Sequence, residues 1–205
     1  MLCLRVPTDE AWTADAMRDV GAVLVDQAYC EMKAASNALS LAARHPEDVE
    51  LVRALTDLAR EEIDHFQRVL AVVSARGLTL GRPPVDAYAA GLRDAARALP
   101  QRGATFLVDR LLVGALIEAR SCERFKLLAN ATRGDDSHSE VHALWGDLLA
   151  SEARHYRTFL DLAVRVGGDR AQVSARLDLL AEAEGELVCT LARAGGQASR
   201  ATVHG

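Results

Sequence analysis

The 205-residue sequence is poor in residues that interrupt helices or favour sheets. It has only 5 prolines, with none between Pro7 and Pro46 and none after Pro100, and aromatic residues make up 4% of it. Proline breaks helix interiors, so these long spans are open to uninterrupted helix. Scarce aromatic residues beside abundant alanine and leucine argue against a β-sandwich. Half of the residues are hydrophobic, which excludes a solvated, disordered chain.

Several functional patterns are also missing. No pair of cysteines has the C-x-x-C spacing of a zinc site, and four cysteines are too few for a disulfide scaffold, so we expect reduced thiols in the cytoplasm. Residues 1–10 lack the apolar core of a signal peptide, and the longest apolar runs, such as 111–117, are too short to cross a membrane. The four cysteines are Cys3, Cys30, Cys122 and Cys189.

The net charge and the absence of a glycine-rich motif bear on two further classes, nucleic-acid-binding proteins and dinucleotide-binding enzymes. The net charge of -5 announces no overall basic surface for nucleic acid, although it leaves a local basic patch open. No Gly-x-Gly-x-x-Gly segment is present, so a flavin or nicotinamide fingerprint is missing and any electrons must come from a separate protein.

Apolar residues recur at helical spacing through most of the sequence. Four long helices are predicted at 17–44, 47–75, 105–131 and 139–166, with Thr8 or Asp9 capping a short first turn. A shorter helix at 85–98 connects the two hairpins, and a last amphipathic helix covers 170–194. This order predicts an all-α fold, a four-helix bundle with a crossover connection and accessory helices. We expect one domain over residues 1–205, with a flexible tail after about 195.

Two of the six histidines share a local pattern. Glu62 precedes His65 by three residues and Glu152 precedes His155 by three, so each pair shares one helix face. A single Glu-x-x-His is most often a solvated helix face. Here, however, both pairs lie midway along long helices among apolar residues at core spacing, where carboxylates are costly unless they meet a cation.

The other two long helices offer further carboxylates. Glu31 lies on the first, and either Glu118 or Glu123 on the third. One Glu from each of two helices and one Glu-x-x-His from each of the others is the ligand set of di-iron and di-manganese bundles. Oxygen and nitrogen donors suit either metal. Counted from the hairpin ends, Glu118 matches the depth of Glu152 better than Glu123 does. The repeated Cys-Glu at 30–31 and 122–123 favours Glu123, so both stay open.

Three segments resemble the MiaE family of tRNA-(2-methylthio-N6-isopentenyladenosine) hydroxylases. They are DQAYCEMKAAS at 26–36, IEARSCERF at 117–125 and SEARHY at 151–156. The pattern at 62–65 falls where that family's second helix carries its ligands. The resemblance spans about residues 5–195, and the loop at 131–140 is longer than is usual in the family.

The resemblance implies a ferritin-like fold and a non-haem di-iron monooxygenase. The substrate would be the isopentenyl side chain of the modified adenosine next to the tRNA anticodon, with O2 as co-substrate. Two iron ions, a separate reductase or ferredoxin-type electron donor, no membrane and a monomer or dimer complete the expectation. The implied iron ligands, through which catalysis would run, are Glu31, Glu62, His65, Glu118, Glu152 and His155.

Other side chains are candidates for substrate or ligand contacts. Charged residues on helix faces could meet tRNA phosphates, aromatic residues could stack on a base or merely pack, and two aspartates could hold ligand histidines or lie in solvent. The phosphate candidates are Arg120, Arg124, Lys126, Arg154 and Arg157. The aromatic candidates are Tyr29, Tyr156 and Trp145, and the aspartates are Asp64 and Asp161.

Two other functions fit the same pattern. The first is another ferritin-like di-iron oxidase, hydroxylase or ferroxidase that acts on a substrate other than RNA. The second is a helical interaction protein or iron-binding protein without catalysis. Metal content separates a purely structural role from the enzymes, and the nucleosides of tRNA separate the hydroxylase from the rest.

Overall fold

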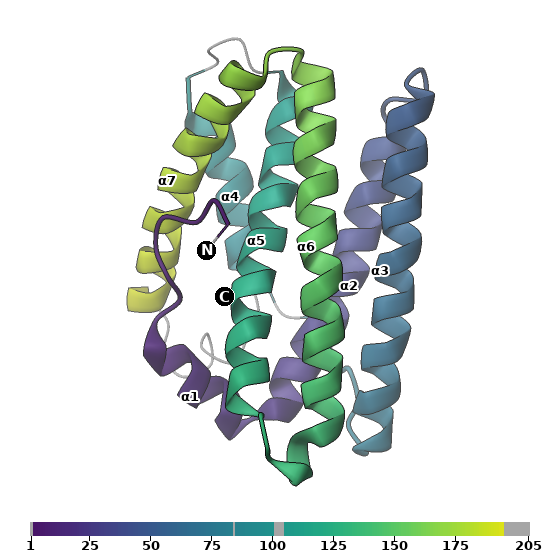
Figure 1. The fold of residues 1–205 in the computed structure, drawn as a ribbon, viewed down its shortest axis with the longest axis vertical. Helices are drawn as coiled ribbons and strands as arrows, with labels where there is room; N and C mark the ends of the chain where they lie inside the picture. The colour runs from purple at the N-terminus through teal and green to yellow at the C-terminus, as the bar shows by residue number, and fades with distance from the viewer. Residues whose placement is uncertain (1, 84, 101–104, 195–205) are drawn as a thin grey trace. The chain divides into compact units, whose positions relative to one another are not determined.

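The computed structural model describes residues 2–83, 85–100 and 105–194, and within these ranges the chain is helical, with no strand (Figure 1). This confirms the all-α prediction. The helices are α1 (Glu10–Arg18), α2 (Val20–Ala43), α3 (Val49–Ala75), α4 (Ala87–Ala98), α5 (Phe106–Ala131), the short 3-10 helix η1 (Asp136–His138), α6 (Ser139–Gly167) and α7 (Arg170–Ala194).

Side-chain caps set where the helices begin. The N–H of Ala22 donates to the side chain of Asp19, and the N–H of Leu51 donates to that of Asp48. Such caps satisfy backbone donors that have no partner within the helix. The helix predicted from residue 17 therefore begins at Val20, and α1 ends before it. The helix predicted from residue 47 begins at Val49 for the same reason.

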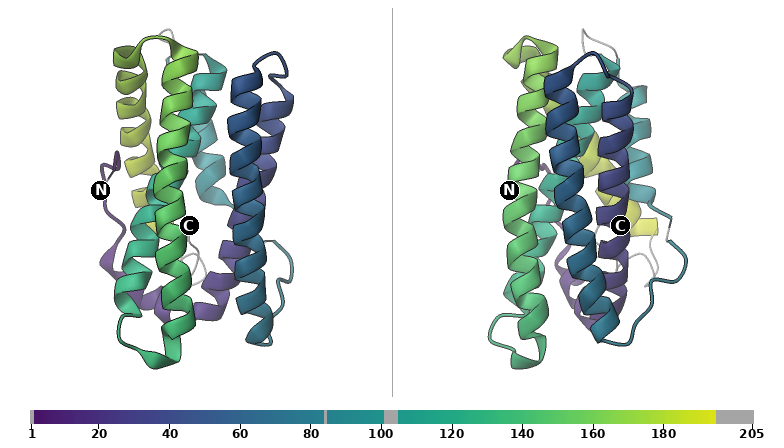
Figure 2. Two further views of the ribbon diagram at one scale, coloured as in Figure 1. Left: turned by 45° about the vertical axis from the view of Figure 1, so that its right-hand side comes forward. Right: turned by 90° about the vertical axis from the view of Figure 1, so that its right-hand side faces the viewer.

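The chain forms two compact units, and the smaller one, Ala16–Val85, is a helical hairpin. Helices α2 and α3 lie side by side and antiparallel, joined by a short turn (Figure 2). Its core is aliphatic, with Leu24, Leu51, Leu55 and Val69 all fully buried. This apolar packing brings the facing sides of α2 and α3 together and so positions the carboxylates between those apolar residues.

The larger unit combines residues up to Asp15 with those from Asp86 onward. Helices α5 and α6 form its hairpin, and α4 and α7 pack on each other and on α5. Gly114 allows close approach of α6, because a Cβ at this position would lie 2.9 Å from the Phe159 ring. Gly168, with φ 74°, ends α6 in a backbone conformation that favours glycine.

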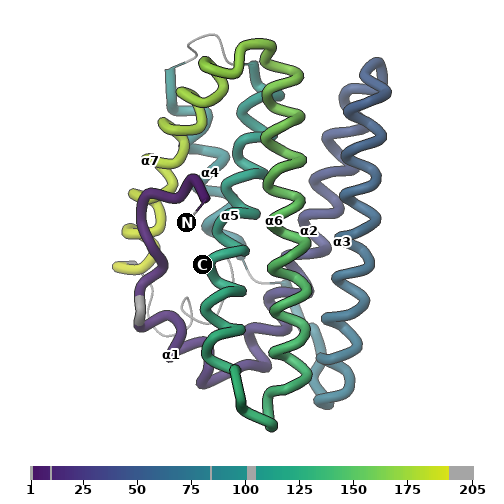
Figure 3. The backbone as a smooth tube through the Cα atoms, in the orientation of Figure 1, coloured from purple at the N-terminus to yellow at the C-terminus, as the bar shows by residue number. Residues whose placement is uncertain are grey.

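The segment before α1 belongs to the larger unit and follows a bent path without regular secondary structure (Figure 3). The carbonyl oxygen of Val6 accepts a hydrogen bond from Arg120, and Thr8 contacts Glu123. Asp9, rather than Thr8, caps the first turn by accepting from the N–H of Ala11. The segment is therefore held by α5.

The predicted long helices are all present to within about three residues at each end. That residues 1–205 form a single domain stays a prediction. The tail after about 195, predicted to be flexible, lies outside the described residues. In the parts of the chain that the structure describes, no helix is both long and apolar enough to span a bilayer.

Candidate metal centre

A first group of buried ligand-type side chains lies within the α2–α3 hairpin. Glu31 comes from α2, and Glu62 and His65 come from one face of α3. The Nδ1 atom of His65 lies 3.3 Å from Oε2 of Glu62 and 3.7 Å from Oε2 of Glu31. One ligand atom of each residue lies within 4.8 Å of the others. We call these three residues the α2–α3 triad.

A second group with the same composition lies within the α5–α6 hairpin. Glu118 comes from α5, and Glu152 and His155 come from one face of α6. All three are buried, and their ligand atoms again lie within 4.8 Å of one another. We call them the α5–α6 triad. Each hairpin thus carries one carboxylate on its first helix and a Glu-x-x-His pair on its second.

Electrostatics in the α2–α3 triad favour a cation. Burial lowers the pKa of His65, but hydrogen bonds and charge from Glu31 and Glu62 outweigh it and raise that pKa to about 10. The two carboxylates therefore hold a proton on the imidazole. A divalent ion could take over that role, because metal ligands bind deprotonated and release their protons.

The donors of both triads fit iron or manganese. They are carboxylate oxygens and imidazole nitrogens, and neither triad contains a thiolate. Cys122 lies on α5 near the second triad, but burial and the charge of Glu152 raise its pKa to about 12. The protonated thiol is a poor metal ligand at neutral pH.

The alternative ligand, Glu123, lies in another environment. Its carboxylate accepts hydrogen bonds from the N–H and hydroxyl of Thr8, at 3.1 and 2.7 Å, and pairs with Arg120. Arg120 is fully buried and also donates to Glu184 of α7 at 2.7 Å. The structure thus brings Glu118, and not Glu123, beside Glu152. It also makes the predicted tRNA contact of Arg120 wrong, because no face of its guanidinium reaches solvent.

The other predicted phosphate contacts divide by exposure. Arg124 is 6% exposed and its guanidinium lies over the Trp12 ring, 5.0 Å from the centroid, so a surface role for it is also wrong. Lys126, Arg154 and Arg157 are exposed, and their contact with tRNA stays a prediction.

The remaining candidates are packed or solvated. Trp145 is fully buried and stacks on Phe125 with centroids 5.6 Å apart, so packing is its role. The Tyr29 hydroxyl donates to the carbonyl oxygen of Gly81 at 2.7 Å, while Tyr156 is half-buried. Asp64 and Asp161 are exposed, as expected of solvated carboxylates.

Sequence reasoning missed Gln27. This buried side chain donates from Nε2 to Oε1 of Glu31 at 2.6 Å and so orients that carboxylate. Its spacing, four residues before Glu31 on the same helix, was the available signal. Outer partners of this kind fix the direction in which a metal ligand points.

Buried Glu, Glu and His side chains on paired antiparallel helices define a class of carboxylate metalloproteins built on helical bundles. The comparisons narrow the class. Residues 1–195 match the family described as tRNA-(MS2IO6A)-hydroxylase (MiaE), and the chain belongs to this family.

Two curated relatives carry the same description, tRNA 2-(methylsulfanyl)-N(6)-isopentenyladenosine(37) hydroxylase. The protein of Pseudomonas putida is 41% identical over 185 residues, covering 90% of this chain and 86% of the relative. The protein of Salmonella typhimurium is 28% identical, covering 90% and 83%.

A solved structure is also similar. It is described as protein 43 with aldehyde deformylating oxygenase activity from Synechococcus, is 36% identical, and matches with a TM-score of 0.83 over 100% of this chain and 96% of that chain. The match confirms the ferritin-like fold class.

Proposed function

We propose that this protein uses O2 to hydroxylate the isopentenyl side chain of 2-methylthio-N6-isopentenyladenosine next to the anticodon of tRNA. Family membership over residues 1–195 and the names of two curated relatives support this activity. The observation that carries it is the pair of buried Glu, Glu, His triads, one in each long hairpin. Buried carboxylates without a polar or ionic role would only destabilise these hairpins.

The two triads together would hold two iron ions. Four carboxylates balance the charge of two divalent ions, as in other di-iron bundles. The bound iron would supply the activation of O2 needed to oxidise an unactivated carbon. One oxygen atom enters the C–H bond as hydroxyl and the other leaves as water. The reaction therefore consumes two electrons and two protons from a separate reductase or ferredoxin-type donor.

The residues of the chain would bind the metal ions, orient the ligands and exclude water from the site. All six proposed ligands are buried, which keeps bulk water from a reactive site. Gln27 donates a hydrogen bond to Glu31 and so orients that carboxylate. Because the triad residues would be occupied as metal ligands, the substrate would be positioned by other residues on the helix surfaces.

The nucleosides of tRNA test this function directly. A strain that lacks the protein should accumulate the non-hydroxylated prenyl adenosine, and a copy of the wild-type gene should restore the hydroxylated form. His155→Ala should fail to restore it, because the imidazole donor is lost. His138→Ala, which changes a half-exposed histidine in η1, should restore it fully. Unchanged hydroxylation in the deletion strain would contradict the proposal.

A second candidate is O2-dependent deformylation of an aldehyde. It rests on the similarity, 36% identity over the whole chain, to a structure described by that activity. Iron-loaded protein with a chemical reductant should be offered an anticodon stem-loop and, separately, straight-chain aldehydes. Hydroxylated nucleoside without formate supports the RNA hydroxylase. Formate without hydroxylated nucleoside supports the second candidate and overturns the first.

A further inference from the structure

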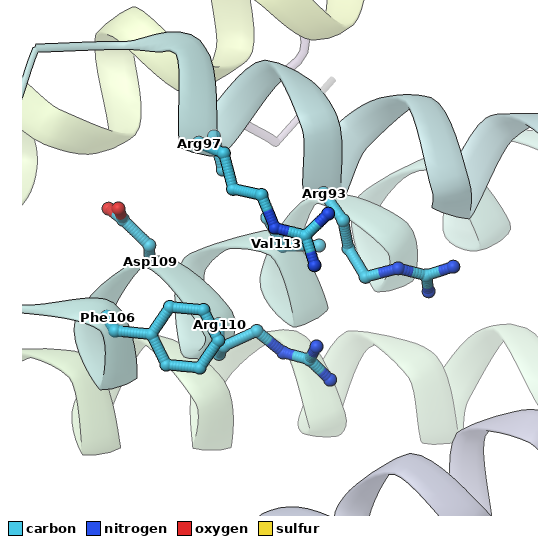
Figure 4. Close-up of a pocket in the computed structure, with 7 residues that line it drawn as sticks. Arg93, Arg97, Phe106, Asp109, Arg110 and Val113 are labelled. Atoms are coloured by element: carbon cyan, nitrogen blue, oxygen red, sulfur yellow. The ribbon is translucent and has the colours of Figure 1, made fainter.

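A small pocket on the larger unit gathers arginine side chains from two helices. It has a volume of about 30 Å³, and Figure 4 shows side chains of α4 and α5 surrounding it. We call it the arginine pocket. Its lining residues are Arg93, Ala96, Arg97, Phe106, Asp109, Arg110 and Val113.

Positive charge exceeds negative charge at the arginine pocket. The carboxylate of Asp109 is held by the buried Arg176, with N–O distances of 2.7 and 2.9 Å. Asp94 pairs with Arg97 at 2.8 Å, in a pair whose side chains are more than 60% exposed and therefore exchange easily with another anion. Arg93 and Arg110 add two further guanidinium groups. The lining thus favours an anionic ligand.

An exposed aromatic ring lies on the same lining. Phe106 begins α5, four residues before Arg110, so both project from one helix face about 5–6 Å apart. The ring is 52% exposed, which is unusual for phenylalanine in a packed helical protein. Aromatic faces beside guanidinium groups are the combination that binds unstacked bases and phosphates of single-stranded RNA.

We propose that the arginine pocket binds the phosphodiester backbone of the anticodon loop, with one unstacked base on Phe106. The proposal deepens the proposed function and rests on it. Guanidinium groups suit phosphate oxygens because they donate in a fixed fork. Arg110 lies about 12 Å, or two helical turns, before Glu118 along the axis of α5, a rise that about two extended nucleotides cover.

The structure moves the RNA contact away from residues that the sequence favoured. Arg120 and Arg124 are buried by partners from within the larger unit, whereas Arg93, Arg97 and Arg110 line a pocket that opens at the surface. An acidic protein, such as the electron donor, would use the same charge. The exposed ring of Phe106 favours RNA over that alternative, because a carboxylate-rich surface gains nothing from stacking on it.

Binding of a fluorescently labelled anticodon stem-loop, measured by anisotropy over a range of salt concentrations, tests the proposal. In wild-type protein the affinity should fall steeply with salt. Arg93→Gln and Arg110→Gln should each lower the affinity and flatten the salt dependence by about 0.7 in log–log slope, as expected for one lost phosphate contact. Phe106→Ala should weaken binding about tenfold with the salt slope unchanged.

Two further variants keep the test decisive. Arg133→Gln makes the same charge change at the opposite end of α5, where Arg133 is exposed and bonds to Asn130, and should bind as wild type. Arg97→Gln changes the most exposed arginine of the pocket and leaves the core untouched. It should lower the affinity for the stem-loop, and this loss cannot arise from unfolding.

Equal affinity of all pocket variants and Arg133→Gln would overturn the proposal. If the same variants then lost only reduction by an acidic donor protein, the pocket would belong to that partner. The same experiments distinguish failure of the proposed function from failure of the pocket proposal. If the protein binds the stem-loop through the pocket but does not hydroxylate its prenyl adenosine, the RNA-binding role of the pocket stands and the hydroxylase function is refuted. If the pocket variants hydroxylate the nucleoside and bind RNA as tightly as wild type, the hydroxylase function stands and the pocket proposal is refuted.

Discussion

Glu118 and Glu123 lie on the same helix, yet their side chains meet different neighbours. Five residues turn an α-helix by about 140° beyond a full turn, so the two carboxylates leave α5 in different directions. One meets Glu152 and His155, and the other meets Thr8 and Arg120. Sequence could narrow the ligand to these two, because both fit a helical pattern. It could not show that the N-terminal segment provides donors for Glu123.

Metal content separates the two residues. Glu118→Ala should lose bound iron, measured by elemental analysis after reconstitution, because one of four carboxylates is removed. Glu123→Ala should retain its iron but unfold at lower temperature, since Arg120 stays buried with part of its counter-charge removed. Equal iron in both variants would contradict the placement of Glu118 in the α5–α6 triad.

The same limit explains the wrong prediction for Arg120. An arginine on a helix is typical of a solvated position, and only its partners reveal that Arg120 is buried. Those partners, Glu184 on α7 and Thr8 near the N-terminus, are more than sixty residues away along the chain. Charge pattern within one helix therefore could not have predicted it.

At the scale of helices, most of the fold follows from local signals. The breaks between the long helices fall at proline or glycine and at aspartate or threonine caps, which are readable in sequence. The apolar spacing in turn predicts which faces pack. What sequence does not give is how closely two helices approach, because that depends on the side chain opposite a glycine.

Two glycines in the α5–α6 hairpin test this packing. A Cβ on Gly114 would meet the buried Phe159 ring at 2.9 Å, whereas a Cβ on Gly146 meets nothing within 4 Å. Gly114→Ala should lower the free energy of unfolding by about 1–2 kcal/mol, because the ring must shift in a packed core. Gly146→Ala should raise it by about 0.5–1 kcal/mol through helix propensity.

Urea unfolding followed by circular dichroism measures both changes. Because the substitutions are chemically identical and lie in the same hairpin, their difference reports the packing at Phe159 rather than a general effect of alanine. A Gly114→Ala protein as stable as the Gly146→Ala protein would contradict the close approach of α5 and α6.

At the scale of the whole molecule, the main feature is that two hairpins have the same arrangement of metal-ligand side chains. Each contributes a carboxylate from its first helix and a Glu-x-x-His pair from its second. The chain belongs to a hydroxylase family, and metal binding by these buried donors would explain why carboxylates lie among apolar residues.

The most direct test is the Mössbauer spectrum of protein reconstituted with ferrous iron and then oxidised. If both triads form one centre, wild-type protein should hold two iron ions per chain as a magnetically coupled pair, since paired metals lie about 3.5–4 Å apart. Glu62→Ala, in the α2–α3 triad, and Glu152→Ala, in the α5–α6 triad, should each abolish the coupled signal. Two uncoupled irons, each lost independently when its own triad is changed, would contradict the account.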